Sequence, residues 1–419
     1  MGTVPSSPKS DGAAPGGAAQ ATRWLNATVL GIGMASLFSD WSHEIATALM
    51  PAFMATMGAA AAWVGLIEGV SDGLSSFAKM ASGHFTDHLD RRKPIAVAGY
   101  VVTAVSTASF GLATAPWHVL VSRSIGWLGR GVRTPVRKAL LAASVTRDTY
   151  GRAFGFERMM DTAGAILGPI TAFVLLGYFQ HRFRPVFAWT LLPGFLAVGC
   201  MAFLVRERSR TKVSSMSFLA GLRKLPVPFR RLLVAVGVFG LGDFAHTLLI
   251  LLATQRLTPI LGIGRAASAA VGLYVAHNVF YSAFALVAGW LADHFPKRYV
   301  LAGSYFLAAL MSLAILALPP GIWTLGLVFV VGGIYVAGME STEDSYCAEL
   351  VEKGQHGMAF GVLATVNGIG DFLSSIVVGV LWTAVGTTAA FGYSMTLSAA
   401  GGVMVLALSP GLVSPKRAA

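Results

Sequence analysis

Long apolar segments separated by short polar loops run through almost the whole sequence. Only 12% of the residues are charged, about half the share usual in soluble domains. An α-helix needs about 20 apolar residues to cross a lipid bilayer, and twelve segments reach that length. They cover roughly residues 25–56, 60–88, 94–114, 117–141, 151–178, 184–205, 230–256, 266–293, 298–318, 321–349, 356–384 and 387–409. The sequence therefore predicts an all-α membrane protein with twelve transmembrane helices.

Lysine and arginine gather in the loops on one side of these segments. The loops hold DRRKP (Asp90–Pro94), PKR (Pro296–Arg298) and a basic stretch from 206 to 231. The exceptions on the other side are Arg182, Arg184, Arg256 and Arg265. Because short loops rich in Lys and Arg stay in the cytoplasm, we expect a multi-pass protein of the cell (inner) membrane with both termini cytoplasmic. The same bias accounts for the net charge of +12, so nucleic-acid binding is not predicted.

The central basic stretch divides the chain into two parts. We expect a disordered cytoplasmic tail at 1–22, a six-helix bundle at 23–206, a cytoplasmic linker at 207–229, a second six-helix bundle at 230–410 and a cytoplasmic tail at 411–419. The first tail is rich in Gly, Pro, Ser and Ala and has no apolar core near its start, so it does not read as a signal peptide. Cys200 and Cys347 lie far apart, which predicts free thiols.

Three short motifs recur in the second half of the sequence at nearly constant spacing. Each pair falls in matching segments: the second and eighth, the fifth and eleventh, and the first and seventh. The pairs are Gly83–His88 with Gly289–His294 and Ala153–Gly155 with Ala359–Gly361, both 206 residues apart, and Asp40-x-x-His43 with Asp243-x-x-His246, 203 residues apart. The shared order and spacing predict two homologous, pseudo-symmetric six-helix halves.

Several of these stretches resemble motifs of the major facilitator superfamily. GHFTDHLDRRK (Gly83–Lys93) is similar to the family's G-x-L-A-D-R-x-G-R-R loop at Gly83, Asp87, Arg91 and Arg92, and departs from it at Phe85, Thr86, His88 and Asp90. GWLADHFPKR, which contains Asp293, is the weaker second copy. Arg123 resembles the arginine of the family's fourth helix, although Trp127 stands where the family often has Gly. The resemblance implies that Gly83, Asp87, Arg91 and Asp293 form a conformational gate.

The fifth segment carries the most informative match. GFERMMDTAGAILGP resembles the fifth-helix motif of the drug:proton antiporter branch at Gly155, Gly164, Gly168 and Pro169, whereas Ala172 and Leu175 replace two further glycines. The resemblance implies two bundles around a central cavity that open alternately to each side. The first, fourth, seventh and tenth segments would line that cavity.

Acidic and imidazole side chains lie inside two of those segments. Asp40, His43 and Glu44 share one helix face, and Asp243 and His246 form an equivalent patch. A charge at mid-membrane costs about 2.5–3.5 kcal/mol, so both patches are expected to face the cavity. A carboxylate beside a histidine can bind and release a proton, which predicts proton coupling or substrate binding. In the alternative interpretation, Asp40 or Asp243 caps a broken helix or bonds between helices.

Basic residues of the fourth segment allow two interpretations. Arg130 and Arg133 could hold an anionic substrate, or they could neutralise acidic residues of the tenth segment, which is the simpler view. Those acidic residues are Glu340, Glu343 and Asp344. The offset of 206 aligns Arg137 with Glu343, so a pair between them would form a gate.

Together these features predict a secondary active transporter, specifically a proton-coupled antiporter that exports a small organic molecule. Three alternatives stay open: import of an anionic metabolite, efflux of a divalent metal cation by two Asp-x-x-His pairs, and a membrane scaffold or receptor without transport. The sequence has no G-x-x-x-x-G-K-[ST] motif and no nucleophile–base arrangement, so neither an enzyme, nor a cofactor, nor a resident metal is predicted. The expected partners are the bilayer, protons and a small-molecule substrate, and the protein is expected to be a monomer.

Overall fold

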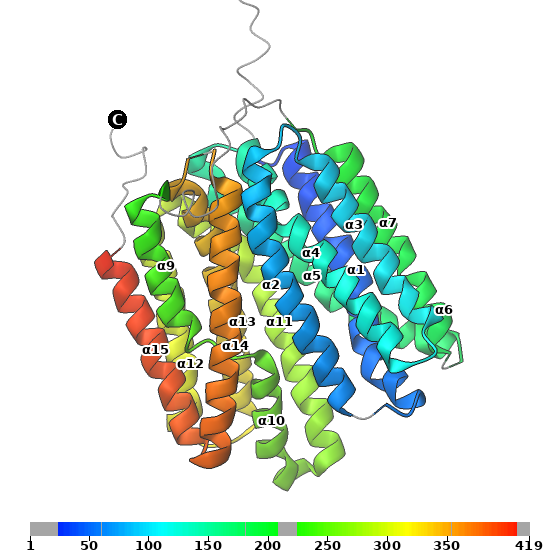
Figure 1. Ribbon diagram of the computed structural model, residues 1–419. Helices are drawn as coiled ribbons and strands as arrows, with labels where there is room; N and C mark the ends of the chain where they lie inside the picture. The colour runs from blue at the N-terminus through cyan, green and yellow to red at the C-terminus, as the bar shows by residue number, and fades with distance from the viewer. Residues whose placement is uncertain (1–23, 60, 181, 208–223, 353, 409–419) are drawn as a thin grey trace, which may run out of the picture.

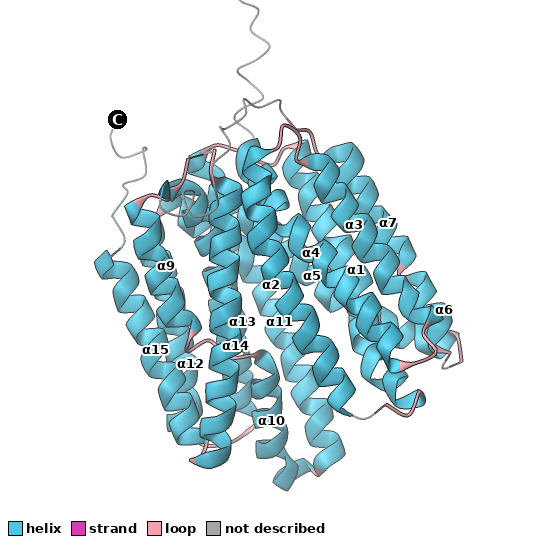
Figure 2. Ribbon diagram, viewed as in Figure 1, coloured by secondary structure: helices cyan, strands magenta, loops and turns pink. Residues whose placement is uncertain are grey.

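The computed structural model describes residues 24–59, 61–180, 182–207, 224–352 and 354–408. These residues form helices joined by short loops, with no β-strand among them (Figure 2). The helices lie side by side as twelve consecutive membrane spans (Figure 1). The prediction of an all-α, twelve-helix membrane protein is confirmed.

The first six spans form the first half of the molecule. They are α1 (Ala27–Thr56), α2 (Ala61–His88), α3 (Lys93–Ala108) continued by the 3₁₀ turn η2 (Ser109–Leu112), α4 (Pro116–Ser144), α5 (Tyr150–Tyr178) preceded by the 3₁₀ turn η3 (Arg147–Thr149), and a sixth span of α6 (Phe183–Trp189), α7 (Leu191–Gly199) and the π-helical turn η4 (Cys200–Leu204).

The remaining six spans form the second half. They are a seventh span made of α9 (Val227–Gly240) and α10 (His246–Leu261), followed by α11 (Ile263–His294), α12 (Lys297–Ala317), α13 (Ile322–Leu350), α14 (His356–Ala384) and α15 (Thr387–Leu408). Most of these bounds lie within a few residues of those predicted. The predicted tail at 1–22 and the tail at 411–419 lie outside the described residues, as does most of the linker, and the division at 206 and 230 stays a prediction.

The seventh span is not the continuous helix that 230–256 predicts, because residues 241–245 break it. Hydroxyl groups from two neighbouring helices bind the backbone of this break. Ser394 of α15 donates to the Gly242 carbonyl at 2.6 Å, and Ser374 of α14 donates to the Asp243 carbonyl. Ser375 of α14 accepts from the Ala245 N–H at 3.0 Å. Because unsatisfied backbone groups are costly at membrane depth, these contacts stabilise the break.

Eight of the twelve spans in the described part of the chain are long and apolar enough to cross a membrane by composition alone. The other four are α1, α2, α4 and the broken α9–α10 span. Three of these carry charged residues along their length, and the fourth is divided into two shorter helices. Charged residues or a break thus set these four spans apart, although α5 and α13 also carry charged residues and still qualify.

The halves meet most extensively through two helix pairs, α2 with α14 and α5 with α11 (Figure 1). Both pairs meet most closely at the end where α2 and α11 stop and α5 and α14 begin, called here the linker end. A Cβ atom added to Gly361 would lie 3.1 Å from the Cα of Gly83, and one added to Gly289 would lie 3.1 Å from the Cα of Gly155. These residues correspond at the offset of 206, so the sequence duplication forms two matching interfaces.

Candidate functional site

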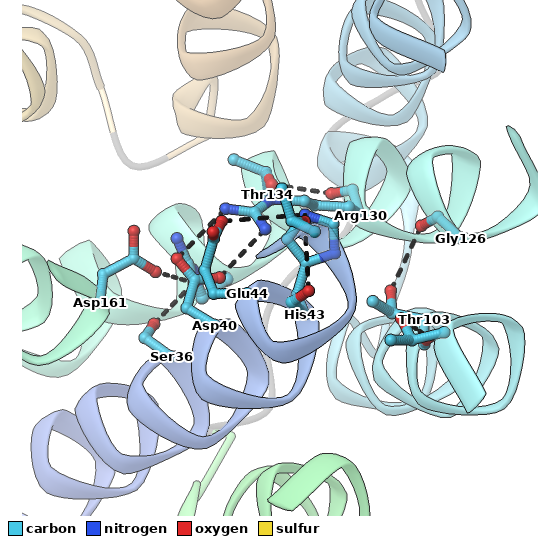
Figure 3. Close-up of polar contacts among 12 residues, drawn as sticks. Ser36, Asp40, His43, Glu44, Thr103, Gly126, Arg130, Thr134 and Asp161 are labelled. Carbon is cyan, nitrogen blue, oxygen red and sulfur yellow. Dashed lines mark hydrogen bonds and ion pairs between the residues drawn. The ribbon is translucent and has the colours of Figure 1, made fainter. Parts of the chain in front are cut away.

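The polar patch of α1 lies against α4 in the first half (Figure 3). Asp40 is buried, and its carboxylate binds Arg130 through both oxygens, with Nη1–Oδ1 at 3.0 Å and Nη2–Oδ2 at 3.3 Å. The Nη2–Oδ2 contact is a hydrogen bond, and hydrogen bonds between two charged groups are stronger than neutral ones. Glu44 follows one turn later and is partly exposed, with Oε1 4.0 Å from Nε2 of His43. Asp40, His43 and Glu44 thus gather around one basic side chain.

His43 belongs to a second chain of contacts. Its Nε2 lies 3.2 Å from the hydroxyl of Thr47, which accepts a hydrogen bond from Arg123 at 3.0 Å. The imidazole packs against the indole ring of Trp127, with centroids 4.4 Å apart, and the indole N–H donates to Asp72 at 2.8 Å. Trp127 therefore organises His43, whereas the sequence marks it only as a departure from the family pattern.

Trp127 also lies between two cations. The guanidinium carbons of Arg123 and Arg130 lie 4.7 Å and 5.1 Å from its ring centroid. Cations are attracted to the faces of aromatic rings, and most strongly to tryptophan. The ring thus connects the Asp40–Arg130 pair with the contacts of His43.

Arg133 and Arg137 face the interior of the first half and not the acidic residues of α13. Arg133 lies over the ring of Tyr100 at 3.9 Å and is almost completely buried. Arg137 binds Glu157 of α5 at 2.6 Å and lies 3.6 Å from Asp161. The predicted pair between Arg137 and Glu343 is therefore wrong, because α5 supplies closer carboxylates to the guanidinium.

Different residues pair across the two halves. Lys138 Nζ lies 2.6 Å from Oδ1 of Asp344. Arg158 of α5 lies 2.9 Å from Glu340 through Nε and 3.7 Å from Asp344 through Nη2, and it also contacts Asp161 at 3.4 Å. Arg130 and Arg133 do not neutralise the acidic residues of α13, because Lys138 and Arg158 take that role. Lys138 and Asp344 are 206 residues apart, so they occupy corresponding positions in the two halves and pair with each other.

Two further acidic residues inside the second half, Glu343 and Asp243, have neutral partners. Tyr305 of α12 donates to Glu343 at 2.5 Å, and Asn367 of α14 donates to its other oxygen at 2.8 Å. Tyr335 of α13 donates to Asp243 at 2.9 Å. These carboxyl groups depend on hydroxyl and amide donors, in contrast with Asp40.

Asp243 and His246 do not form one helical patch as predicted. Asp243 lies in the break, and His246 begins α10. The ring of His246 lies 4.7 Å from that of His277, whose Nδ1 is 3.1 Å from the Phe329 carbonyl oxygen. The Asp-x-x-His spacing is thus shared by the first and seventh spans, but the structural patch is not. In the seventh span the break places Asp243 and His246 in different segments.

The gate residues lie at the linker end. Asp293 of α11 accepts from the backbone N–H groups of Gly151 at 2.6 Å and Arg152 at 3.0 Å, and its carboxylate also binds Arg152 Nε at 2.8 Å. A carboxylate at a helix start satisfies free N–H groups and the positive end of the helix dipole. Gly83 lies at the α2–α14 contact, and Arg91 is exposed in the following loop. The side chain of Asp87 lies outside the described residues.

The antiporter-like motif of α5 packs on two neighbours. Gly155 faces α11, whereas Gly164 and Gly168 face α1, where an added Cβ would lie 2.9 Å from the Trp41 nitrogen and 3.0 Å from the Glu44 carbonyl carbon, respectively. Pro169 lies within α5. The motif therefore sets how closely α5 approaches the helix that carries Asp40 and Glu44.

Metal ligation finds no support in the part of the chain that the structure describes. Among those residues, no group of three or more His, Cys, Asp or Glu side chains could hold a metal ion. Cys200 and Cys347 are both free thiols. The two Asp-x-x-His pairs do not come together as a four-ligand site, because Asp40 binds Arg130 and Asp243 binds Tyr335.

Comparison with known proteins agrees with this architecture. The family model described as Major Facilitator Superfamily matches residues 30–273 and 232–419. The chain is 27% identical to an uncharacterized MFS-type transporter, MJ1317, of Methanocaldococcus jannaschii over 384 residues, which cover 92% of this chain and 95% of that protein. It is 25% identical to the multidrug resistance protein MdtH of Shigella boydii over 321 residues, which cover 73% and 75% of the two chains.

Solved structures share the fold at low sequence identity. The human organic anion transporter MFSD10 (TETRAN) superposes with a TM-score of 0.74 at 14% identity, over 90% of this chain and 99% of that one. The fucose:proton symporter FucP of Escherichia coli superposes with a TM-score of 0.71 at 15% identity, over 92% and 100%. With a family model that matches nearly the whole described chain, this multi-pass membrane transporter belongs to the major facilitator superfamily.

Proposed function

We propose that the chain is a proton-coupled antiporter that exports a small organic molecule by alternating access. The observation that carries this proposal is the ion pair between the buried Asp40 and the partly exposed Arg130, with His43 and Glu44 beside it. The α5 glycine motif that resembles the drug:proton antiporter branch packs directly on this patch. The similarity to MdtH, a multidrug resistance protein, supports the same class of substrate.

Coupling would arise because a proton and Arg130 compete for the same carboxylate. A proton on Asp40 removes the charge that holds the guanidinium, and Arg130 is then released to another partner. Both side chains are tolerable at membrane depth only while each has a partner. Proton binding at Asp40 would therefore change which groups of the patch are available to a substrate, and each conformation would expose the patch to a different side.

The conformation described here would be closed to the cytoplasm. The Lys138–Asp344 and Arg158–Glu340 pairs, the Asp293 cap on α5 and the glycine contacts all lie toward the linker end. The distribution of Lys and Arg predicts that this end is cytoplasmic. We further propose that Asp87 caps α14 as Asp293 caps α5, that both termini are cytoplasmic, and that the protein works as a monomer in the inner membrane.

Import of an anionic metabolite is less well supported. Its two binding charges, Arg130 and Arg133, are already engaged, one with Asp40 and the other with the ring of Tyr100. Arg133 is also almost completely buried, which leaves no surface for a substrate.

The test uses purified protein in liposomes with an imposed pH gradient and a panel of organic substrates. We expect flux of at least one substrate to follow the gradient, and Asp40→Asn to abolish the gradient-driven part. Glu352→Gln, an exposed acidic residue after α13, is the matched control and should transport like the wild type. Gradient-independent flux in the wild type, or full coupling in Asp40→Asn, would contradict the proposal.

A further inference from the structure

Three acidic residues lie close together on α13, and they face two directions. Glu340 and Asp344 point to the first half, where Arg158 and Lys138 bind them. Glu343 points into its own half, between α12 and α14, and is only 2% exposed. Neighbouring carboxylates on one helix therefore have opposite environments.

Among the described residues, no cation lies at ion-pair distance from Glu343. Its two oxygens accept from the Tyr305 hydroxyl at 2.5 Å and the Asn367 amide at 2.8 Å. The basic and aromatic titratable groups that neighbouring helices bring near α13 have other partners. They are Arg158 of α5 with Glu340 and Asp344, Lys138 of α4 with Asp344, Tyr281 of α11 with Glu340, and His246 of α10 against His277. The other acidic groups on this side are Asp243, which binds Tyr335, and Asp371 of α14, whose charge would repel that of Glu343.

Two neutral donors only about offset the cost of a buried negative charge. Each hydrogen bond to a charged group contributes about 1.5–3 kcal/mol, whereas the desolvation of a buried ion costs several kcal/mol even after relaxation. Because no cation adds to this balance, a proton can bind Glu343 without displacing a charged partner. Tyr305 can accept as well as donate, so its hydrogen bond to the carboxyl group survives protonation with its direction reversed. The hydrogen bonds from Tyr305 and Asn367 also stabilise the charged carboxylate, so the proton can be released again.

The partners of Glu343 connect it to the broken seventh span. The ring of Tyr305 stacks on Phe239 in the last turn of α9, with centroids 3.7 Å apart and planes at 10°. The break follows directly, and its Asp243 binds Tyr335 of α13. Tyr305 thus contacts both the Glu343 carboxyl group and the helix end where the break begins.

We propose that Glu343 is a proton-binding site of the transport cycle, separate from the Asp40 patch. It takes up and releases a proton within the second half and exchanges no ion pair across the halves. This inference rests on the proposed proton-coupled transport for its role, whereas proton binding itself can be measured without a substrate.

The first experiment records infrared spectra of the purified protein over a series of pH values. Part of the carbonyl-stretch absorption of protonated carboxylic acids should be present in the wild type and lost in Glu343→Gln, whereas other buried carboxyl groups with neutral partners, such as Asp243, should keep their own part. Glu349→Gln is the matched control, because Glu349 lies on the same helix but pairs with Lys297 at 2.6 Å, and it should keep the band. Tyr305→Phe removes one donor to the charged form, so its band should persist to higher pH. An unchanged band in Glu343→Gln, or an unshifted one in Tyr305→Phe, overturns the proton site.

The second experiment separates this site from the transporter assignment. In liposomes at equal pH on both sides, Glu343→Gln should retain substrate counterflow, and under a pH gradient it should lose the gradient-driven flux. If Glu343→Gln shows the wild-type rate of gradient-driven flux, the role of Glu343 in the cycle is overturned. Absence of gradient-driven flux in the wild type would instead defeat the proposed antiport, while the infrared band still reports whether Glu343 holds a proton.

Discussion

The fourth and tenth spans, α4 and α13, occupy corresponding places in the two halves but carry opposite charges. At the offset of 206, Arg130 and Arg133 correspond to Val336 and Met339, and Arg137 and Lys138 correspond to Glu343 and Asp344. The halves nevertheless touch through matching glycines, since Gly83 and Gly361 approach each other as closely as Gly289 and Gly155. The duplication thus keeps the backbone contacts alike and makes the charges complementary.

The difference has a simple electrostatic reason. A residue on the pseudo-symmetry axis meets its own counterpart, and two identical charges there would repel. Lys138 and Asp344 are such counterparts, and they form a buried pair at 2.6 Å. Complementary divergence of α4 and α13 therefore allows the halves to attract each other where they meet, and it leaves the second half dependent on cations from the first.

The largest effect is expected from Lys138→Asp. This change places two carboxylates against each other in a buried site, and breaking one buried pair already costs about 3–5 kcal/mol. We expect the closed form at the linker end to be lost, together with a fall in thermal stability in detergent. The double variant Lys138→Asp/Asp344→Lys should recover most of both. A double variant no better than the single one would refute the importance of complementarity.

Of two buried glutamates, Glu157 and Glu343, only Glu157 is expected to cause a similar loss of stability when it is replaced by glutamine. Glu157→Gln leaves Arg137 without its closest carboxylate, which should lower stability by about 3–5 kcal/mol. Glu343→Gln leaves no cation unpaired and keeps acceptor and donor atoms for Tyr305 and Asn367, so its cost should be well below that value. Both residues are at most 2% exposed, which makes them a matched pair. Thermal unfolding in detergent distinguishes them, and equal losses would show that the two halves do not differ in this way.

The sequence predicted the spans and the duplication well, because both depend on local properties. Segment length and apolarity mark a membrane helix, and the shared offset marks corresponding residues. The break at 241–245 was missed, although Gly240 and Gly242 flank its start. What makes the break stable are hydroxyl groups on α14 and α15, more than 120 residues away, and no local pattern reports them.

Partner choice in the candidate site was the least predictable feature. The predicted gate at Arg137 and Glu343 differs from the observed pair at Lys138 and Asp344 by one position. One position is about 100° of rotation around an α-helix, and this rotation directs Arg137 to Glu157 and Lys138 to α13. The sequence identified the charged residues, but which of them meet is decided by how the helices are rotated against one another.

The shared glycine contacts lead to a symmetric prediction. Gly83→Ala and Gly289→Ala, which correspond at the offset of 206, each place a Cβ in close contact with a carbonyl oxygen of the opposite half, that of Gly357 or that of Gly151, and overpacking typically costs about 1–3 kcal/mol. Both variants should open the linker end to a similar degree. Gly303→Ala is the control, because nothing lies within 4 Å of a Cβ there.

Opening can be followed by the distance between spin labels placed at Phe85→Cys and Phe295→Cys. Both positions are exposed and lie on opposite halves at the linker end. The native cysteines, Cys200 and Cys347, would first be replaced by alanine. An effect at only one of the two interfaces would break the symmetry inferred from the glycines.

The smallest effect is expected at the helix caps, where the two halves should again behave alike. Asp293→Asn weakens the contacts of its carboxylate with Gly151 and Arg152, and the loss of a capping side chain costs about 0.5–2 kcal/mol. Asn can still accept a hydrogen bond, so the loss should fall at the low end of that range and shift the spin-label distances only slightly. Asp87→Asn should do the same if the corresponding carboxylate caps α14. If Asp293→Asn changes stability and the spin-label distances but Asp87→Asn does not, the duplication preserves the glycine contacts but not the caps.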